Sequence, residues 1–257
     1  MDHLDSAEIE KVKEGKRRGE ALEVIVGDQV ELNDWFGPNA LLTRTSEYDD
    51  VMNGIDAVAE FDFGEERKPE RLALGVDASM RADVVMIERK ITRNIEKVTG
   101  QREPAEVRYF ESQILDAAGH PSVKGRLEAV VPVVIGLDGE DCDRLMGLFV
   151  QLLRLRSNKE KTESINALIK EKTLEMQKHP VQMVFLSEIK TQLEMYLGLF
   201  KEKVMDGDHL AYQSKVKRLL AITNEIIDSK TEISTEELGE DGVWQAIIEV
   251  AGIKLAG

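Results

Sequence analysis

Cysteine is almost absent from this chain, because Cys142 is the only one among its 257 residues. A single cysteine excludes an intramolecular disulfide and a zinc site built from several cysteines. No window approaches 18 consecutive apolar residues, so the sequence predicts no membrane-spanning helix. The first six residues are polar and acidic, unlike the basic and then apolar start of a signal peptide. We therefore expect a cytoplasmic protein with no membrane partner.

Acidic residues outnumber basic ones. The chain has 34 Lys and Arg residues and 49 Asp and Glu residues, which gives a net charge of −15. Residues 1–150 carry 19 basic and 32 acidic residues, a net of −13, whereas residues 151–257 carry 15 and 17. Such a surface repels a polyanion such as DNA unless metal ions or a local basic patch intervene. The charge argues against avid, non-specific nucleic-acid binding and leaves a weak or partner-assisted contact open.

The composition, 42% hydrophobic and 32% charged, is ordinary for a folded chain that is long enough to bury a core. The pattern changes after about residue 157. We interpret residues 1–156 as an α/β core with an N-terminal helix, and residues 157–257 as a helical subdomain or a helical extension of that core.

Apolar patterns predict the elements of both parts. We expect strands at about 55–62, 71–78, 105–110 and 130–136, which together form a small mixed sheet flanked by helices. We expect helices over the first 20 residues, from Asn39 onward, at 80–98, from Asp138 onward, at 158–179, 181–204 and 209–229, and at 243–250. The polar stretch between the first two strands suits a hairpin loop.

Acidic residues recur where the first two strands begin and end. Asp56 opens the first strand, Asp77 lies late in the second, and Glu47, Asp49 and Asp50 lie just upstream. Carboxylates on neighbouring strands can hold Mg²⁺, which prefers oxygen ligands and keeps several of its waters. The pattern therefore indicates a candidate magnesium site.

The order of elements in residues 39–155 resembles the PD-(D/E)XK nuclease superfamily. The segments Ser46–Glu60 and Val131–Asp138 are also similar to bacterial proteins related to that superfamily. The resemblance implies a restriction-endonuclease-like core and Mg²⁺-dependent hydrolysis of nucleic acid. It implies that Asp56 and Asp77 are metal ligands and that Asp50 or Glu47 is a supporting acid.

Two features depart from the superfamily pattern. The lysine expected two positions after Asp77 is Ser79, and the best substitute is Lys90 on the following helix, where it would stabilise developing charge. The predicted helix at 80–98 also follows two strands rather than a three-stranded meander.

Each candidate has an ordinary structural alternative. Asp56 can be a turn residue, Asp77 a strand-end or helix-capping residue, Glu47 and Asp50 part of a solvated charge run, and Lys90 a surface lysine. Two functions therefore stay open: a Mg²⁺-dependent nuclease, or an inactive protein of the same fold whose C-terminal helices bind a protein partner or form a homodimer.

Cys142 lies at a predicted helix start, a position that lowers the pKa of a thiol. No histidine neighbours it in the sequence, so we favour an incidental buried residue over a nucleophile.

Overall fold

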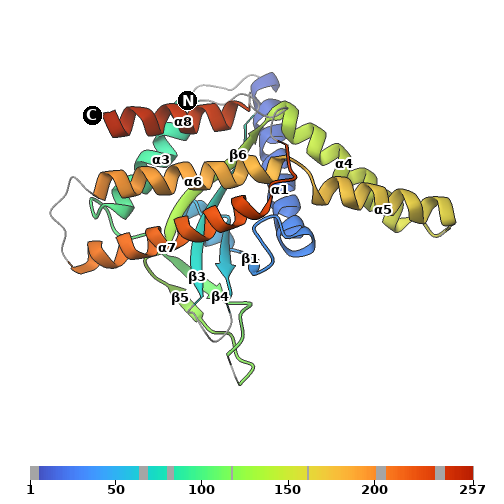
Figure 1. The fold of residues 1–257 in the computed structure, drawn as a ribbon. Coiled ribbons are helices and arrows are strands. Elements are labelled where there is room, and N and C mark those ends of the chain that lie inside the picture. Colours follow the sequence, from blue (N-terminus) through green and yellow to red (C-terminus); the bar gives the residue numbers. More distant parts are fainter. Residues whose placement is uncertain are drawn as a thin grey trace.

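The computed structural model describes residues 6–63, 69–79, 84–116, 118–160, 162–200, 207–234 and 241–256. In this part of the chain, helices surround a small mixed sheet (Figure 1). The helices are α1 (Ser6–Asn33), α2 (Glu47–Asn53), α3 (Val84–Val98), α4 (Gly139–Ser157), α5 (Glu163–Gln177), α6 (Val181–Phe200), α7 (Gly207–Ser229) and α8 (Gly242–Ala256). The strands are β1 (Ala40–Arg44), β2 (Ala57–Phe61), β3 (Glu70–Ser79), β4 (Val107–Glu111), β5 (Lys124–Leu127) and β6 (Val131–Asp138). The expected α/β class is confirmed.

The central sheet has the strand order β1-β2-β3-β6. β1, β2 and β3 form an antiparallel meander, and β6 pairs with β3 in parallel. Parallel neighbours need a crossover connection, and α3 lies in the connection between β3 and β6. The strands expected at 55–62, 71–78 and 130–136 are confirmed, and so is the helix expected at 80–98 from Val84 onward, because residues 80–83 lie outside the described residues.

The helix expected from Asn39 onward is wrong, because this segment forms β1. Ala40 lies opposite Phe61 and Arg44 opposite Ala57 in the ladder with β2. Gly37, just before the strand, has a φ of 87°, a conformation that glycine adopts without steric cost. A three-residue apolar run does not distinguish a helix from a strand, so long-range pairing decides. As a result, α3 follows three strands and not two.

The strand expected at 105–110 is present as β4, but it does not join the central sheet. β4 pairs with β5 in a separate two-stranded sheet. Phe110 of this sheet packs with Val58 and Ala73 on one face of the central sheet. The four-stranded sheet is thus completed by β1 in place of the 105–110 strand.

A buried carboxylate links the two sheets. Glu60 of β2 is fully buried, and its Oε1 lies 2.8 Å from Arg71 Nε. Ser112 Oγ donates to the same oxygen at 2.7 Å, and the amide of Gln113 donates to Oε2 at 3.0 Å. Because its charge and both its oxygens are paired, Glu60 has a structural role.

β6 is an edge strand of the sheet, and α6 supplies side chains that pair with its outer edge. The amide of Val134 donates to Gln192 Oε1 at 2.9 Å, and Gln192 Nε2 donates to the Val134 carbonyl at 2.6 Å. The amide of Gly136 donates to Glu188 Oε2 at 3.0 Å. These bonds satisfy backbone groups that an edge strand otherwise exposes.

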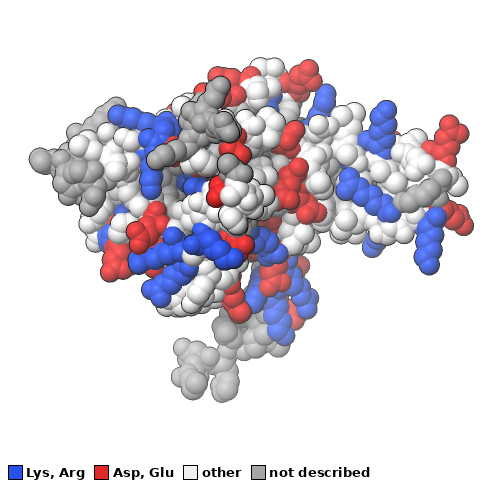
Figure 2. Space-filling model, turned by 90° about the horizontal axis from the view of Figure 1, so that it is seen from below, with Lys and Arg blue, Asp and Glu red and all other residues white. Residues whose placement is uncertain are grey.

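The C-terminal helices share one hydrophobic core with the sheet. Phe185 and Leu193 of α6 and Ile247 of α8 belong to the same buried cluster as Leu72 and Val133. The α4–α5 pair projects from this body (Figure 1). On the face seen from below, basic and acidic side chains are interspersed along that projection (Figure 2).

Candidate metal-binding site

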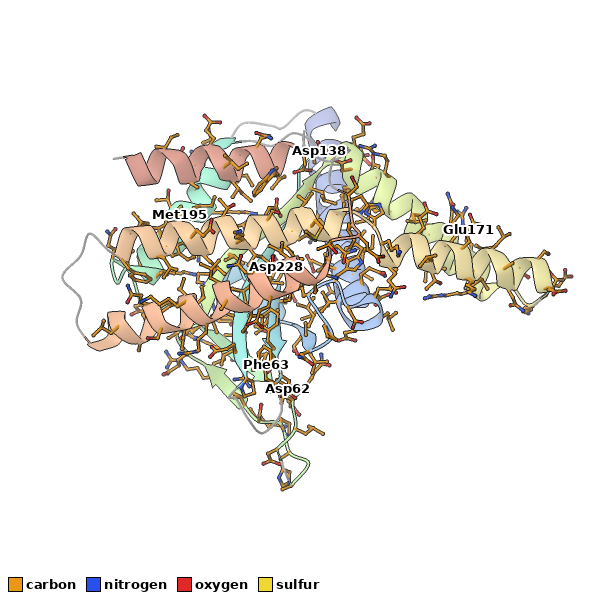
Figure 3. The ribbon with its side chains drawn as sticks, in the orientation of Figure 1. Asp62, Phe63, Asp138, Glu171, Met195 and Asp228 are labelled. Carbon is orange, nitrogen blue, oxygen red and sulfur yellow. The ribbon has the colours of Figure 1, made fainter. Side chains whose placement is uncertain are left out.

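The predicted strand aspartates lie toward one end of the central sheet, where strands begin or end; we call this end the sheet edge. β1, β3 and β6 end at this edge and β2 begins there, as their registers require. Asp56 directly precedes β2, and Asp77 is the third residue from the end of β3. The side chain of Asp77 lies outside the described residues. Figure 3 labels Asp138 at this edge, whereas Asp62 and Phe63, which follow β2, lie at the opposite end of the sheet.

Asp56 occupies an irregular point of the β2–β3 ladder. Ala57 is the Cα partner of Leu74, yet the amide of Asp56 donates to the carbonyl of Leu74 at 2.9 Å. The ladder therefore shifts by one residue, as at a β-bulge, a feature that changes the direction of a side chain. On the other side, the amide of Thr45 donates to the Asp56 carbonyl at 3.0 Å. The backbone of Asp56 is thus fixed between two strands.

Asp56 lines a cleft between α1, the end of β1 and α2, with a volume of about 810 Å³. The carboxylates that line this cleft are Glu20, Glu23, Glu47, Asp50 and Asp56, and the cations are Lys16 and Arg44. Arg44 Nη2 lies 2.6 Å from Glu23 Oε2 and Lys16 Nζ lies 3.8 Å from Glu20 Oε1, so both cations already have a carboxylate partner. An excess of carboxylate oxygens is the ligand set that a hard divalent cation prefers.

The acidic run of α2 divides into two roles. Glu47 and Asp50 are exposed, three residues apart on the helix, and both line the cleft. Asp49 is fully buried and has no part in the cleft lining. It accepts hydrogen bonds from Ser46 Oγ, Asn53 Nδ2 and the amides of Arg108 and Tyr109. Asp49 therefore has a structural role, which is to hold α2 against β4.

Lys90 is exposed on α3 and is not among the residues that line the cleft. The lining cations are Lys16 from α1 and Arg44 from β1, and the sequence interpretation missed both. It also missed the acidic residues Glu20 and Glu23. Lys16, Glu20 and Glu23 are spaced by four and three residues, so they share one helix face, and this spacing was the available signal.

A second group of carboxylates lies farther along the same edge. Asp138, Asp141 and Asp241 each offer an oxygen within 4.8 Å of the others, close enough to bind a metal ion. Asp138 caps α4 by accepting from the amides of Glu140 and Asp141, both at 3.0 Å. Asp241 precedes α8 and accepts from the Asp138 amide at 2.9 Å. Sequence reasoning missed this cluster, because Asp241 is 103 residues from Asp138 in the chain.

The surroundings of this cluster disfavour negative charge. Burial raises the pKa of Asp141 above its ordinary value, Asp138 raises it further, and Arg144 partly lowers it. Burial also raises the pKa of Asp241, while hydrogen bonds from the amides of Asp138 and Trp244 lower it in part. A bound cation would stabilise the charged form of these carboxyl groups.

The cleft and the second cluster are separate sites. Ser79, the last residue of β3, is the Cα partner of Asp138, five positions beyond Leu74. Strand geometry then places the Cα atoms of Asp56 and Asp138 about 17 Å apart, which is too far for one ion to contact both side chains.

Cys142 is fully buried, and burial raises the pKa of its thiol to about 11. The lowered pKa expected at a helix start is wrong, because the cost of desolvating a thiolate exceeds the effect of the helix end. A thiol that stays protonated and buried is no nucleophile.

No model of a known protein family matches the chain, and no curated protein or solved structure matches it. None of the described helices is long and apolar enough to cross a membrane.

Proposed function

We propose that the cleft binds Mg²⁺ and hydrolyses phosphodiester bonds of nucleic acid. The observation that carries this proposal is convergence: Asp56, Asp50 and Glu47, from two different segments, line one cleft. The cleft opens where β1 ends and β2 begins, and Asp77 lies on the neighbouring strand β3, three positions beyond Leu74, the partner of Ala57.

The topology supports the proposal. A three-stranded antiparallel meander, a helix and a further strand parallel to β3 follow one another along the chain. The PD-(D/E)XK superfamily, which the sequence resembles, has this order, and β1 is the strand that the sequence interpretation lacked. We therefore propose that residues 1–156 form a restriction-endonuclease-like core.

In this proposal Asp56 and Asp77 are the metal ligands. Strand spacing and rise place their Cα atoms about 9 Å apart, and Mg²⁺ binds carboxylate oxygens at about 2.1 Å. When bound, Mg²⁺ supplies charge neutralisation and an activated water for an in-line displacement. Asp50 and Glu47, which line the same cleft, would support the ligand set as additional carboxylates.

The cation that stabilises developing charge has three candidates. Ser79 replaces the motif lysine, and the sequence favours Lys90 as its substitute. The cleft itself contains Lys16 and Arg44. Both have a carboxylate partner, but Lys16 Nζ lies 3.8 Å from Glu20 whereas Arg44 Nη2 lies 2.6 Å from Glu23, so the more loosely paired Lys16 is the better alternative to Lys90.

Cleavage assays test the function directly. Fluorescein-labelled DNA and RNA oligonucleotides are incubated with the protein and Mg²⁺ or Mn²⁺, and the products are separated by electrophoresis. We expect cleavage that Asp56→Asn and Asp77→Asn abolish and that Asp228→Asn, an exposed residue of α7, leaves unchanged. Comparison of Lys90→Ala with Lys16→Ala identifies the stabilising cation.

The alternative function is a catalytically inactive protein that binds a protein partner. Ser79 at the lysine position favours this alternative, because the motif lysine is missing. Absence of cleavage with every oligonucleotide and both metal ions would support it and contradict the nuclease proposal.

A further inference from the structure

Exposed aromatic residues form a surface beside the cleft. Tyr109 of β4 is 68% exposed, and Tyr48 of α2 is 38% exposed. Val51 and Met52 follow Tyr48 by three and four residues, so they share its helix face, and both are exposed. We name these four residues the Tyr48–Tyr109 surface. A contiguous exposed apolar patch of this kind marks an interaction site more often than scattered apolar residues do.

The two rings contact each other and a guanidinium group. The rings of Tyr48 and Tyr109 meet edge to face, with centroids 6.0 Å apart and planes at 89°. The guanidinium carbon of Arg108 lies 5.1 Å from the Tyr48 ring centroid, within the range of a cation–π contact. Glu106 accepts a hydrogen bond from Arg108 Nε at 3.0 Å, which orients the guanidinium.

Buried contacts hold this surface in place. The fully buried carboxylate of Asp49 accepts from the amide of Arg108 at 2.9 Å and from the amide of Tyr109 at 3.3 Å. Asp49 neighbours Tyr48 on α2, so a single carboxylate fixes both segments that carry the exposed rings. The arrangement is therefore preorganised rather than a chance contact of two mobile side chains.

The surface is continuous with the cleft. Val51 belongs to the surface and also lines the cleft, together with Glu47 and Asp50 of the same helix. A ligand that crosses α2 thus passes from the carboxylates of the cleft to the exposed rings within about one helical turn.

The charge changes from acidic to basic at the far end of α2. Arg93 Nη2 donates to the carbonyl of Met52 at 2.8 Å, and Lys97 Nζ donates to the carbonyl of Asn53 at 3.1 Å. Arg93 thus lies beside Met52 of the Tyr48–Tyr109 surface and Arg108 beside the Tyr48 ring, whereas Lys97 is buried. Cations beside aromatic rings suit a ligand that alternates phosphates with planar bases.

We infer that the Tyr48–Tyr109 surface stacks the unpaired bases of a single-stranded nucleic acid whose backbone enters the cleft. This inference rests on the proposed function, because the nucleic-acid backbone approaches α2 only if the cleft binds it. Tyrosine rings stack on any base, so the contact is tolerant of sequence. A duplex hides the faces of its bases, so the surface selects single strands, loops or ends.

Fluorescence anisotropy of the full-length protein tests the inference. The probes are fluorescein-labelled oligo(dT) and oligo(rU) of 20 nucleotides and a 20-base-pair DNA duplex, each titrated in Ca²⁺. We expect tighter binding of a single strand than of the duplex. Whether oligo(dT) or oligo(rU) binds more tightly identifies DNA or RNA as the source.

Two pairs of variants assign the binding to the rings. Tyr109→Leu and Tyr48→Leu keep apolar volume but remove the aromatic face, and each is expected to weaken single-strand binding about five- to hundred-fold. Tyr109→Phe and Tyr48→Phe keep the ring and are expected to bind as the wild type does. Unchanged binding by both leucine variants, stronger binding of the duplex, or no binding of either single strand would overturn the inference. Thermal unfolding of each variant checks that these exposed substitutions leave the fold intact.

The outcomes separate this inference from the proposed function. Single-strand binding that depends on the rings, without any cleavage, supports the inference and contradicts the nuclease proposal. A different result supports the nuclease proposal alone: Asp56→Asn abolishes cleavage, whereas the leucine variants cleave and bind single strands as the wild type does. That second result would reassign the Tyr48–Tyr109 surface to a protein partner.

Discussion

The amide of Asp56 donates to the carbonyl of Leu74 at 2.9 Å, although Ala57 is the residue that faces Leu74 in the ladder. The hydrogen bonding therefore shifts by one residue at the point where β2 begins, as at a β-bulge. The irregularity lies at the sheet edge where the acidic cleft opens. Bulges of this kind are frequent beside active sites, because they turn a side chain out of the regular alternation.

Asp56→Asn is the first substitution that tests the cleft. Asparagine keeps the size of the side chain but removes its charge, so we expect the affinity for Mg²⁺ to fall at least tenfold. Asp50→Asn should weaken binding less, because Asp50 is exposed on α2 and serves a supporting role. Isothermal titration calorimetry with Mg²⁺ and Mn²⁺ measures both effects.

The control for this titration is Asp228→Asn, which removes an exposed carboxylate of α7. It should bind Mg²⁺ as the wild type does. Equal heats for the wild type and Asp56→Asn would contradict the cleft as the metal site.

The second cluster predicts a pH-dependent stabilisation by divalent cations. Burial raises the pKa of Asp141 and of Asp241, so protonation of these groups stabilises the folded state. That stabilisation is present at low pH and is lost as the pH rises through the folded-state pKa values. At pH 7 a bound cation replaces the missing protons. We expect Mg²⁺ or Ca²⁺ to raise the free energy of unfolding by about 2.7 kcal/mol at one hundred times the dissociation constant.

Asp141→Asn should abolish this gain, whereas Glu140→Gln, which changes an exposed neighbour on α4, should keep it. Thermal unfolding at pH 7 and pH 4 measures the effect, and the gain should be smaller at pH 4. Because the cleft also binds cations in our proposal, the same experiment is performed in the Asp56→Asn background. A gain that survives Asp141→Asn but disappears with Asp56→Asn would exclude the second cluster.

Segments with a strong apolar period were predictable from the sequence. The helices expected at 80–98, 181–204 and 209–229 repeat apolar residues every three or four positions and are confirmed as α3, α6 and α7; residues 80–83 and 201–204 lie outside the described residues. β1 and β5 were not predictable, because Ala40–Leu42 is a short apolar run and Lys124–Leu127 has no strand pattern. Both strands exist through pairing with distant partners, which local sequence does not encode.

The candidate site was predictable only in part, for a similar reason. Glu47, Asp50 and Asp56 lie within ten residues of one another, so their pattern was visible. Glu20 reaches the same cleft from α1, and Asp241 reaches Asp138 from the start of α8. Contacts of this kind depend on how helices pack on the sheet edge.

His179 predicts a loss of stability in mild acid. Burial lowers its pKa from 6.5 to about 4, and its ring stacks on Trp35 with centroids 6.3 Å apart. The unfolded chain therefore binds a proton more readily than the folded protein between these two values. Stability that is present above pH 6.5 is lost as the pH falls toward 4, by about 2 kcal/mol between pH 7.5 and pH 5.

Urea unfolding at pH 7.5 and pH 5 measures this loss for the wild type and for His179→Gln. The variant should be less stable at pH 7.5 but should show a pH dependence smaller by about 2 kcal/mol. His120→Gln, which changes an exposed histidine, should retain the dependence of the wild type. An unchanged pH dependence in His179→Gln would show that His179 is not the group responsible.

The pairing of α6 with the edge of β6 predicts a large effect from one neutral side chain. Gln192 is fully buried and both donates to and accepts from the backbone of Val134. Gln192→Met keeps the volume but leaves a buried amide and a buried carbonyl unpaired, so we expect a loss of about 2–4 kcal/mol. Gln151→Met, at an exposed position of α4, should change the free energy of unfolding by less than about 0.5 kcal/mol. Urea unfolding measures both variants, and equal stabilities would mean that water or a backbone shift satisfies the edge of β6 in place of Gln192.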